Sequence, residues 1–112
     1  MKKIEAIIRP FKLEEVMGIL TAMGINGATI TEVRVQGKQH GQRDAERGPT
    51  YSLDFYPMIQ LEVVVTDEQK EEAVASILRV TKTGNTGDGK IFISPLDEAI
   101  RISTDEHDVN AV

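Results

Sequence analysis

Residues 83–96 read Thr-Gly-Asn-Thr-Gly-Asp-Gly-Lys-Ile-Phe-Ile-Ser-Pro-Leu, a glycine-rich run followed directly by an apolar strand at 91–94. The run, residues 83–90, contains Gly84, Gly87 and Gly89. Glycine allows positive φ and carries no Cβ, so successive backbone N–H groups can converge on an anion. Lys90 adds a point charge for phosphate oxygens. The composition therefore predicts a phosphate-binding loop, with a tight turn into the strand as the alternative.

A strand, a helix and a second strand are predicted in the first third of the chain. Apolar and polar residues alternate over 3–9, and Pro10 ends this strand. An apolar stripe at helical spacing follows, and Gly24 stands where a C-terminal cap is expected. A β-rich composition over 28–35 then predicts the next strand, which ends at Gly37.

The second half of the chain also pairs a strand with a helix. Alternating apolar residues predict a strand over 58–65, and Thr66 opens a capping box with Gln69. The buried face of the following helix is expected to carry Ala73, Val74, Ile77 and Leu78. With the strand at 91–94, the order is βαββαβ. This order predicts one α+β domain over residues 1–112: a ferredoxin-like sandwich of four antiparallel strands with both helices on one face.

A long polar segment, residues 38–56, separates the second and third strands of this prediction. It carries little apolar content before Leu53, so it offers nothing to anchor a core. Exposed loops of this length inside a small domain are usually functional or disordered, and the residues alone leave that choice open.

Composition excludes several classes of function. The 112 residues carry a net charge of −5, 4% aromatic residues and no Trp, which disfavours a nucleic-acid partner, including an RNA-binding ferredoxin-like domain. The absence of cysteine excludes disulfides and thiolate chemistry. No signal peptide or membrane-spanning run is visible, so we expect a cytoplasmic protein without direct membrane insertion. The two histidines, His40 and His107, are scattered and predict no metal site.

Over its whole length the chain resembles the PII signal-transduction proteins. The matching segments are the opening block at 2–13, the strand at 29–33, Gly37 with Gln39, the loop end at 51–57 and, most specifically, the run at 83–92. The resemblance implies a homotrimer whose sheets line a central barrel. Nucleotide sites would lie in the clefts between subunits, and the long loops would project towards a target.

The same resemblance implies the residues of a site for ATP or ADP. Gly87, Asp88, Gly89 and Lys90 would hold the phosphates, with Arg101 contributed by the neighbouring subunit. Adenosine and the remaining phosphate contacts would fall to Ile7, Thr29, Gly37, Lys38, Gln39 and Val64. Residue chemistry agrees with these roles, because apolar Ile7 and Val64 can sandwich a base and a guanidinium offers a forked donor to phosphate.

Several positions depart from the family pattern. Met58 stands where relatives that sense 2-oxoglutarate carry a lysine for a ligand carboxylate, so we expect a weak or absent response to 2-oxoglutarate. Lys38 and Ser103 stand where the family usually carries arginines, which weakens recognition of a γ-phosphate. Preference for ADP or AMP over Mg-ATP is therefore an alternative. Tyr51 stands at the residue that some relatives modify by nucleotidylylation, but its neighbours Pro49 and Thr50 differ from theirs, so we favour a tyrosine that only contacts the target.

The sequence thus predicts a non-catalytic regulator that binds adenine nucleotides and controls a partner through residues 38–56. The resemblance implies a membrane transporter or an enzyme of nitrogen metabolism as the partner. One alternative is a divergent energy sensor of a transporter that responds to ADP or AMP and not to 2-oxoglutarate. A second is a weak ATPase, which lacks a Walker-type lysine followed by Ser or Thr, because Ile91 follows Lys90.

Overall fold

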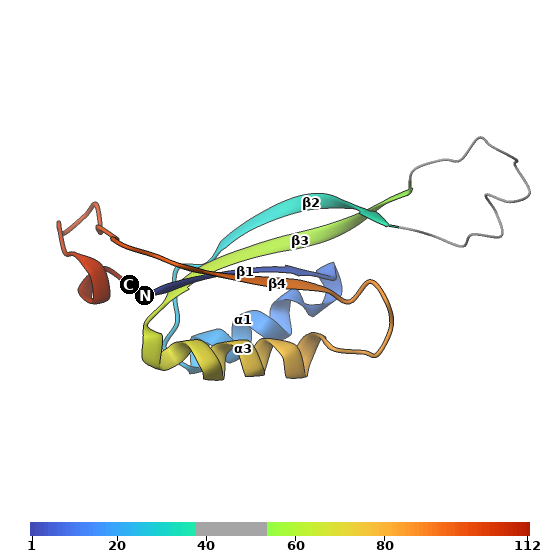
Figure 1. Ribbon diagram of the computed structural model, residues 1–112, viewed down its shortest axis with the longest axis horizontal. Helices are drawn as coiled ribbons and strands as arrows, with labels where there is room; N and C mark the ends of the chain where they lie inside the picture. Colours follow the sequence, from blue (N-terminus) through green and yellow to red (C-terminus); the bar gives the residue numbers. More distant parts are fainter. Residues whose placement is uncertain (38–53) are drawn as a thin grey trace, which may run out of the picture.

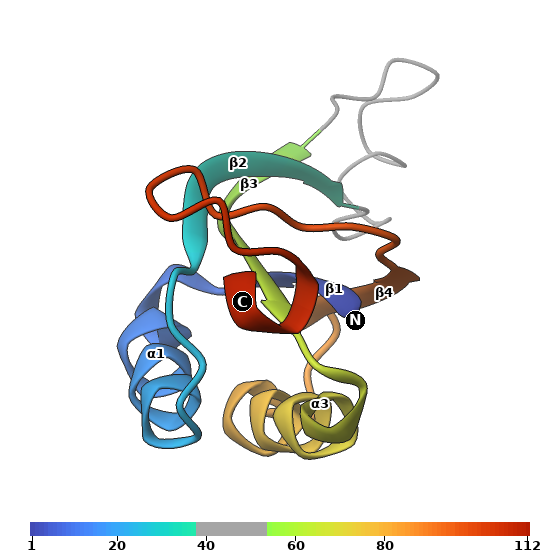
Figure 2. The same cartoon turned by 90° about the vertical axis from the view of Figure 1, so that its left-hand side faces the viewer.

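The computed structural model describes residues 1–37 and 54–112. Its elements are β1 (Lys2–Ile8), a 3₁₀ turn (Pro10–Lys12), α1 (Leu13–Ala22), β2 (Thr29–Gly37), β3 (Asp54–Val65), α3 (Asp67–Thr81), β4 (Gly89–Pro95) and a second 3₁₀ turn (Asp108–Ala111). The four strands form one antiparallel sheet in the order β2-β3-β1-β4. Both helices cover the same face of this sheet (Figure 1, Figure 2). The predicted α+β fold is therefore confirmed.

Strand alternation gives the sheet two chemically different faces. In β1, Ile4, Ala6 and Ile8 are buried beneath the helices. Ile7 lies on the opposite face, which we call the outer face, and it pairs with Gln60 of β3 and Lys90 of β4. Because side chains along a strand alternate, partners in register share a face, and the outer face collects polar side chains with a few apolar ones.

The second helix begins as the sequence predicts. The backbone N–H of Gln69 donates to Thr66 Oγ1 at 3.2 Å, and the backbone N–H of Thr66 donates to Gln69 Oε1 at 3.1 Å. These two bonds satisfy backbone donors that the first helical turn would otherwise leave unpaired. Gly24 has φ +78° directly after the last turn of α1, so it also occupies its predicted place.

The predicted buried face of α3 is partly wrong. Ala73 and Ile77 are buried as expected, but Leu78 is 48% exposed, and Ser76 and Thr81 are buried in its place. Residues 73, 77 and 81 of the helix face the sheet. The buried hydroxyl of Thr81 is satisfied because it donates a hydrogen bond to the Ile77 carbonyl at 2.8 Å. Leu78 consequently lies over the edge strand β4, outside the core.

Two strands begin earlier than the sequence predicts. β3 starts at Asp54, so the last three residues of the expected loop, 54–56, belong to the strand. They pair with the end of β2, through Gly37 opposite Asp54, and this ladder supplies hydrogen bonds that local composition does not reveal. β4 likewise starts at Gly89, because Gly89 and Lys90 pair with Ile8 and Ile7. The remainder of the expected loop, 38–53, lies outside the described residues.

Neither helix in the described part of the chain combines the length and the apolar content needed to cross a bilayer.

Candidate functional site

The glycine-rich loop is closed by one carboxylate. Asp88 accepts hydrogen bonds from the backbone N–H and the hydroxyl of Thr83, and from the backbone N–H of Gly84 at 3.1 Å. The bonds from Thr83, supported by the Gly84 N–H and the nearby Arg9 guanidinium, hold the pKa of Asp88 below its ordinary value. Asp88 therefore ties the first part of the loop to the last.

The predicted positive φ angles are confirmed at all three glycines of the loop. Gly84, Gly87 and Gly89 have φ of +88°, +94° and +117°. At Gly89 a second requirement is added, because a Cβ there would lie 1.8 Å from the carbonyl oxygen of Ile7. The chain can therefore pass from the loop into β4 only if residue 89 is glycine.

Arg9 is a site residue that sequence reasoning missed. It follows β1, and its Nη2 donates to the backbone oxygen of Thr86 at 3.3 Å. Its Nε lies 3.4 Å from Asp88 Oδ1. Arg9 was visible only as part of the opening block, and nothing local to residue 9 indicates a contact with residues 86 and 88.

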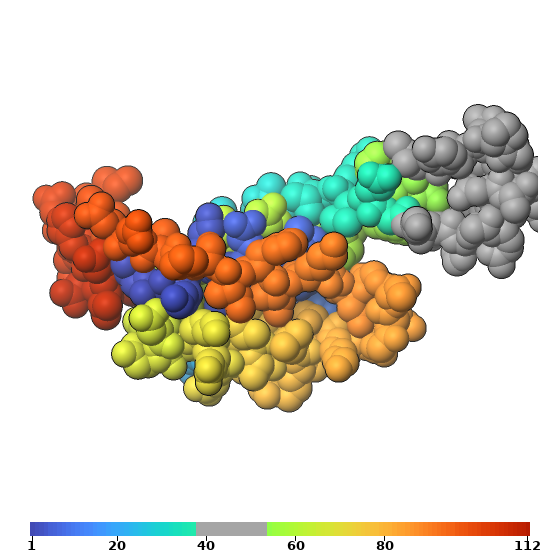
Figure 3. Space-filling model, viewed as in Figure 1, coloured from blue at the N-terminus to red at the C-terminus, as the bar shows by residue number. Residues whose placement is uncertain are grey.

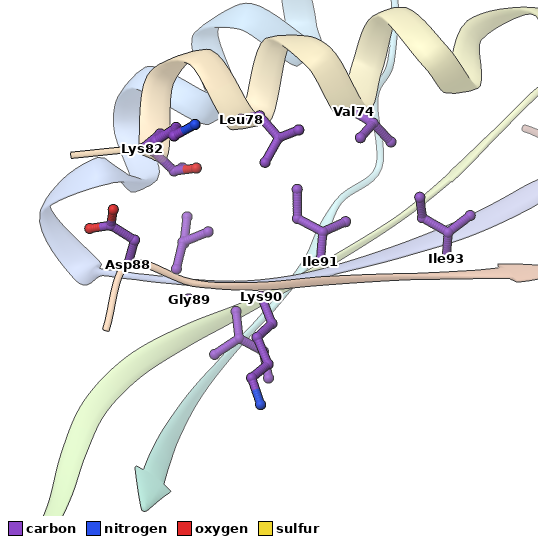
Figure 4. A pocket seen from close by; sticks show the side chains of 11 residues that line it. Val74, Leu78, Lys82, Asp88, Gly89, Lys90, Ile91 and Ile93 are labelled. Carbon is purple, nitrogen blue, oxygen red and sulfur yellow. The ribbon is translucent and has the colours of Figure 1, made fainter. Parts of the chain in front are cut away.

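Lys90 lies on the outer face of the sheet. Figure 4 shows its side chain directed away from α3, whereas Ile91 and Ile93 point towards that helix. A second lysine, Lys82, lies at the end of α3 on the helix side. The two lysines therefore flank the glycine-rich loop on opposite faces of the sheet.

An outer-face cavity of 950 Å³ brings several predicted residues together. Its predicted members are Ile7, Gly37, Gly87, Gly89 and Lys90, and its further lining includes Arg9, Val35, Tyr56, Met58, Thr86 and Phe92. Glycine backbone, one lysine and apolar walls thus converge in one place. Such a cavity suits a ligand with an anionic group and a flat apolar group.

Other predicted residues lie apart from this cavity within one chain. Thr29 begins β2 at the opposite end from Gly37, and Val64 pairs with Lys3 near the far end of β3. Arg101 belongs to the C-terminal segment, which lies at the opposite end of the molecule from the glycine-rich loop (Figure 1, Figure 3), and its Nε lies 3.8 Å from Glu106. Lys38, Gln39 and Tyr51 lie outside the described residues.

Met58 is part of an apolar wall at the base of the segment that joins β2 to β3. Its side chain is only 7% exposed, and it lines the cavity beside Tyr56 and Val35. The Tyr56 ring packs so closely on Gly37 that a Cβ there would meet it at 2.3 Å. Burial in this wall leaves the thioether next to apolar groups and supplies no charge to a ligand.

A separate apolar groove of 460 Å³ lies between α3 and β4 on the helix side (Figure 4). Its apolar lining includes Val74, Leu78, Ile91 and Ile93. The Lys90 side chain points away from this groove, towards the other face of the sheet. Among the residues that the structure describes, no group of three or more His, Asp or Glu side chains is placed to hold a metal ion.

Comparison with known proteins identifies relatives over the full length of the chain. The family model described as Nitrogen regulatory protein P-II matches residues 1–106. Proteins named Nitrogen regulatory protein P-II from Cereibacter sphaeroides, Nostoc punctiforme and Pasteurella multocida are 50%, 49% and 47% identical to this chain, and each alignment covers 100% of both proteins.

Proposed function

This chain belongs to the nitrogen regulatory protein P-II family of non-catalytic signal-transduction regulators, and we propose that it works by binding ATP or ADP and controlling a partner protein. Family membership confirms the prediction that the chain is not an enzyme, and it gives no support to the ATPase alternative. The observation that carries the nucleotide proposal is the outer-face cavity, where the glycine-rich loop and Lys90 meet the apolar Ile7.

The separation of the expected ligand residues supports a site shared between subunits, as in the homotrimer that we propose. The C-terminal segment, which contains Arg101, lies at the opposite end of the molecule from the glycine-rich loop, so one chain cannot bring both to one phosphate group (Figure 3). A neighbouring copy that places its C-terminal segment against the loop would complete the cradle, and its Val64 and Thr29 would approach the base held by Ile7. The nucleotide would then bind only between subunits.

The chemistry of binding follows from the loop. Backbone N–H groups at positive-φ glycines converge on phosphate oxygens, and Lys90 adds a charge-assisted contact. Gly37 lines the cavity directly before the segment at 38–53, and it pairs with Asp54 directly after that segment. A nucleotide that binds one arrangement of this segment more tightly than another raises the population of the first arrangement. The resulting change in affinity for the partner is set by the difference between the nucleotide's affinities for the two arrangements. A membrane transporter or an enzyme of nitrogen metabolism in the cytoplasm remains the proposed partner.

The two lysines beside the loop provide a matched test. Isothermal titration calorimetry with ATP and with ADP compares the wild type with Lys90→Ala and Lys82→Ala. We expect Lys90→Ala to abolish measurable binding, because a contact to a charged phosphate is lost, and Lys82→Ala to bind almost as the wild type does, because it lies on the other face. Equal affinities of the two variants would refute the site.

The buried position of Met58 supports a weak response to 2-oxoglutarate. A lysine in that place would supply a charge-assisted contact to a ligand carboxylate, and its loss costs about 2–5 kcal/mol. We expect the wild type to bind Mg-ATP with the same affinity with and without 2-oxoglutarate, and Met58→Lys to introduce a dependence on it. Strong enhancement in the wild type would refute this part, and ATP, ADP and AMP titrations would rank the nucleotides.

A further inference from the structure

We propose that Arg9 is a positioning residue that braces the glycine-rich loop, so that the loop is already in its binding conformation before a nucleotide arrives. The inference rests on the proposed nucleotide site, but it concerns a residue that neither glycine pattern nor phosphate chemistry singles out. Although Arg9 also lines the outer-face cavity, its polar contacts are with the loop, so we expect it to act through the loop and not through direct contact with the ligand.

The contacts of Arg9 span the two halves of the loop. Nη2 donates to the Thr86 carbonyl at 3.3 Å, and Nε lies 3.4 Å from Asp88 Oδ1. Nε is fully shielded from water and has no hydrogen-bond partner of its own among the described residues, so the Asp88 carboxylate is its polar neighbour. A buried guanidinium nitrogen without this carboxylate would be costly, which couples the placement of Arg9 to that of Asp88.

Asp88 carries the constraint to the rest of the loop. The same carboxylate accepts from the Thr83 and Gly84 backbone N–H groups at 2.7 and 3.1 Å. One guanidinium and one carboxylate therefore fix residues 83, 84, 86 and 88 relative to the end of β1. Within the loop, the backbone N–H of Asn85 also donates to Thr83 Oγ1 at 3.4 Å.

The shape of the loop agrees with a brace. A Cβ at Gly87 would lie 3.4 Å from Arg9 Nη2, an ordinary van der Waals distance, so the guanidinium lies directly beside this part of the loop. Arginine presents several donors in a rigid planar fork, whereas lysine presents one compact ammonium. A lysine at residue 9 would keep the positive charge but could not hold the Thr86 carbonyl and the Asp88 carboxylate in the same way.

This difference gives a test that does not need the ligand. Hydrogen exchange of the backbone amides is measured in the wild type, Arg9→Lys, Asp88→Asn and Lys12→Gln without nucleotide. Lys12 is the matched control, because it is a nearby cation that pairs with Glu15 and not with the loop. We expect exchange in residues 84–87 to be about tenfold faster in Arg9→Lys and Asp88→Asn, and unchanged in Lys12→Gln.

The affinity for ADP then separates bracing from direct contact. We expect Arg9→Lys to weaken ADP binding about five- to tenfold, and the double variant with Asp88→Asn to bind no more weakly than Asp88→Asn alone, because both changes release the same loop. Unchanged exchange in Arg9→Lys, or independent losses that multiply in the double variant, would overturn the proposal. If the wild type fails to bind ADP, the proposed function falls, while the exchange data still decide whether Arg9 braces the loop.

Discussion

Replacement of Gly89 by alanine should be far more damaging than replacement of Gly84, although both glycines belong to one loop and both have positive φ. At Gly84, with φ +88°, an added Cβ meets nothing within 4 Å. At Gly89, with φ +117°, it would lie 1.8 Å from the Ile7 carbonyl oxygen. The pair thus separates the strain of the backbone angle from the clash between β4 and β1.

The expected magnitudes follow from these two terms. Backbone strain alone costs about 1–2 kcal/mol for alanine at positive φ, which we expect for Gly84→Ala. In Gly89→Ala the Cβ must also retreat by about 1.2 Å to reach a 3.0 Å separation, which breaks the start of the β1–β4 ladder. Losing one or two ladder hydrogen bonds at about 0.5–1.5 kcal/mol each brings the total to about 1.5–5 kcal/mol.

Urea unfolding followed by circular dichroism, at equal protomer concentration, measures both variants against the wild type. We expect a clearly lower unfolding midpoint for Gly89→Ala than for Gly84→Ala. Free energies of unfolding that agree within about 0.5 kcal/mol would refute the reasoning, because the close approach of Gly89 to Ile7 would then have no energetic consequence.

Three further predictions concern stability. Thr66→Ala removes the acceptor for the Gln69 N–H and should lower the free energy of unfolding by about 1 kcal/mol, measured by urea unfolding. Ile77→Ala should cost about 2–5 kcal/mol and Leu78→Ala about 1 kcal/mol or less in the same assay, since Ile77 is 1% exposed and Leu78 is 48% exposed; equal losses would contradict the observed helix orientation. Because the pKa of Asp88 is lower in the folded protein than its ordinary value of 3.8, the Asp88 carboxylate should stabilise the fold fully at pH values above 3.8. This stabilisation should be lost as the pH falls through the lower folded pKa. The free energy of unfolding of Asp88→Asn, measured in acid, should therefore depend less on pH than that of the wild type.

The site was predictable where its chemistry is local to one stretch. Three glycines before an apolar strand indicate a loop that needs positive φ, and the structure confirms this at each of them. The role of Asp88 was less visible. Its side chain holds the loop through Thr83 and Gly84, while the phosphate contact that the family resemblance implies for it stays a prediction. Only the path of the folded chain determines which way that carboxylate points.

By itself the sequence determined the order of the elements, the cap of α3 and the glycine turns, because alternation, helical stripes and capping boxes are set by residues a few positions apart. The tertiary structure alone decided which row of α3 faces the core, that residues 54–56 extend β3, and that Arg9 reaches a carbonyl 77 residues away. These depend on how strands pair and how helices rotate on the sheet, and a contact between residues so distant in the chain leaves no periodic signal in it.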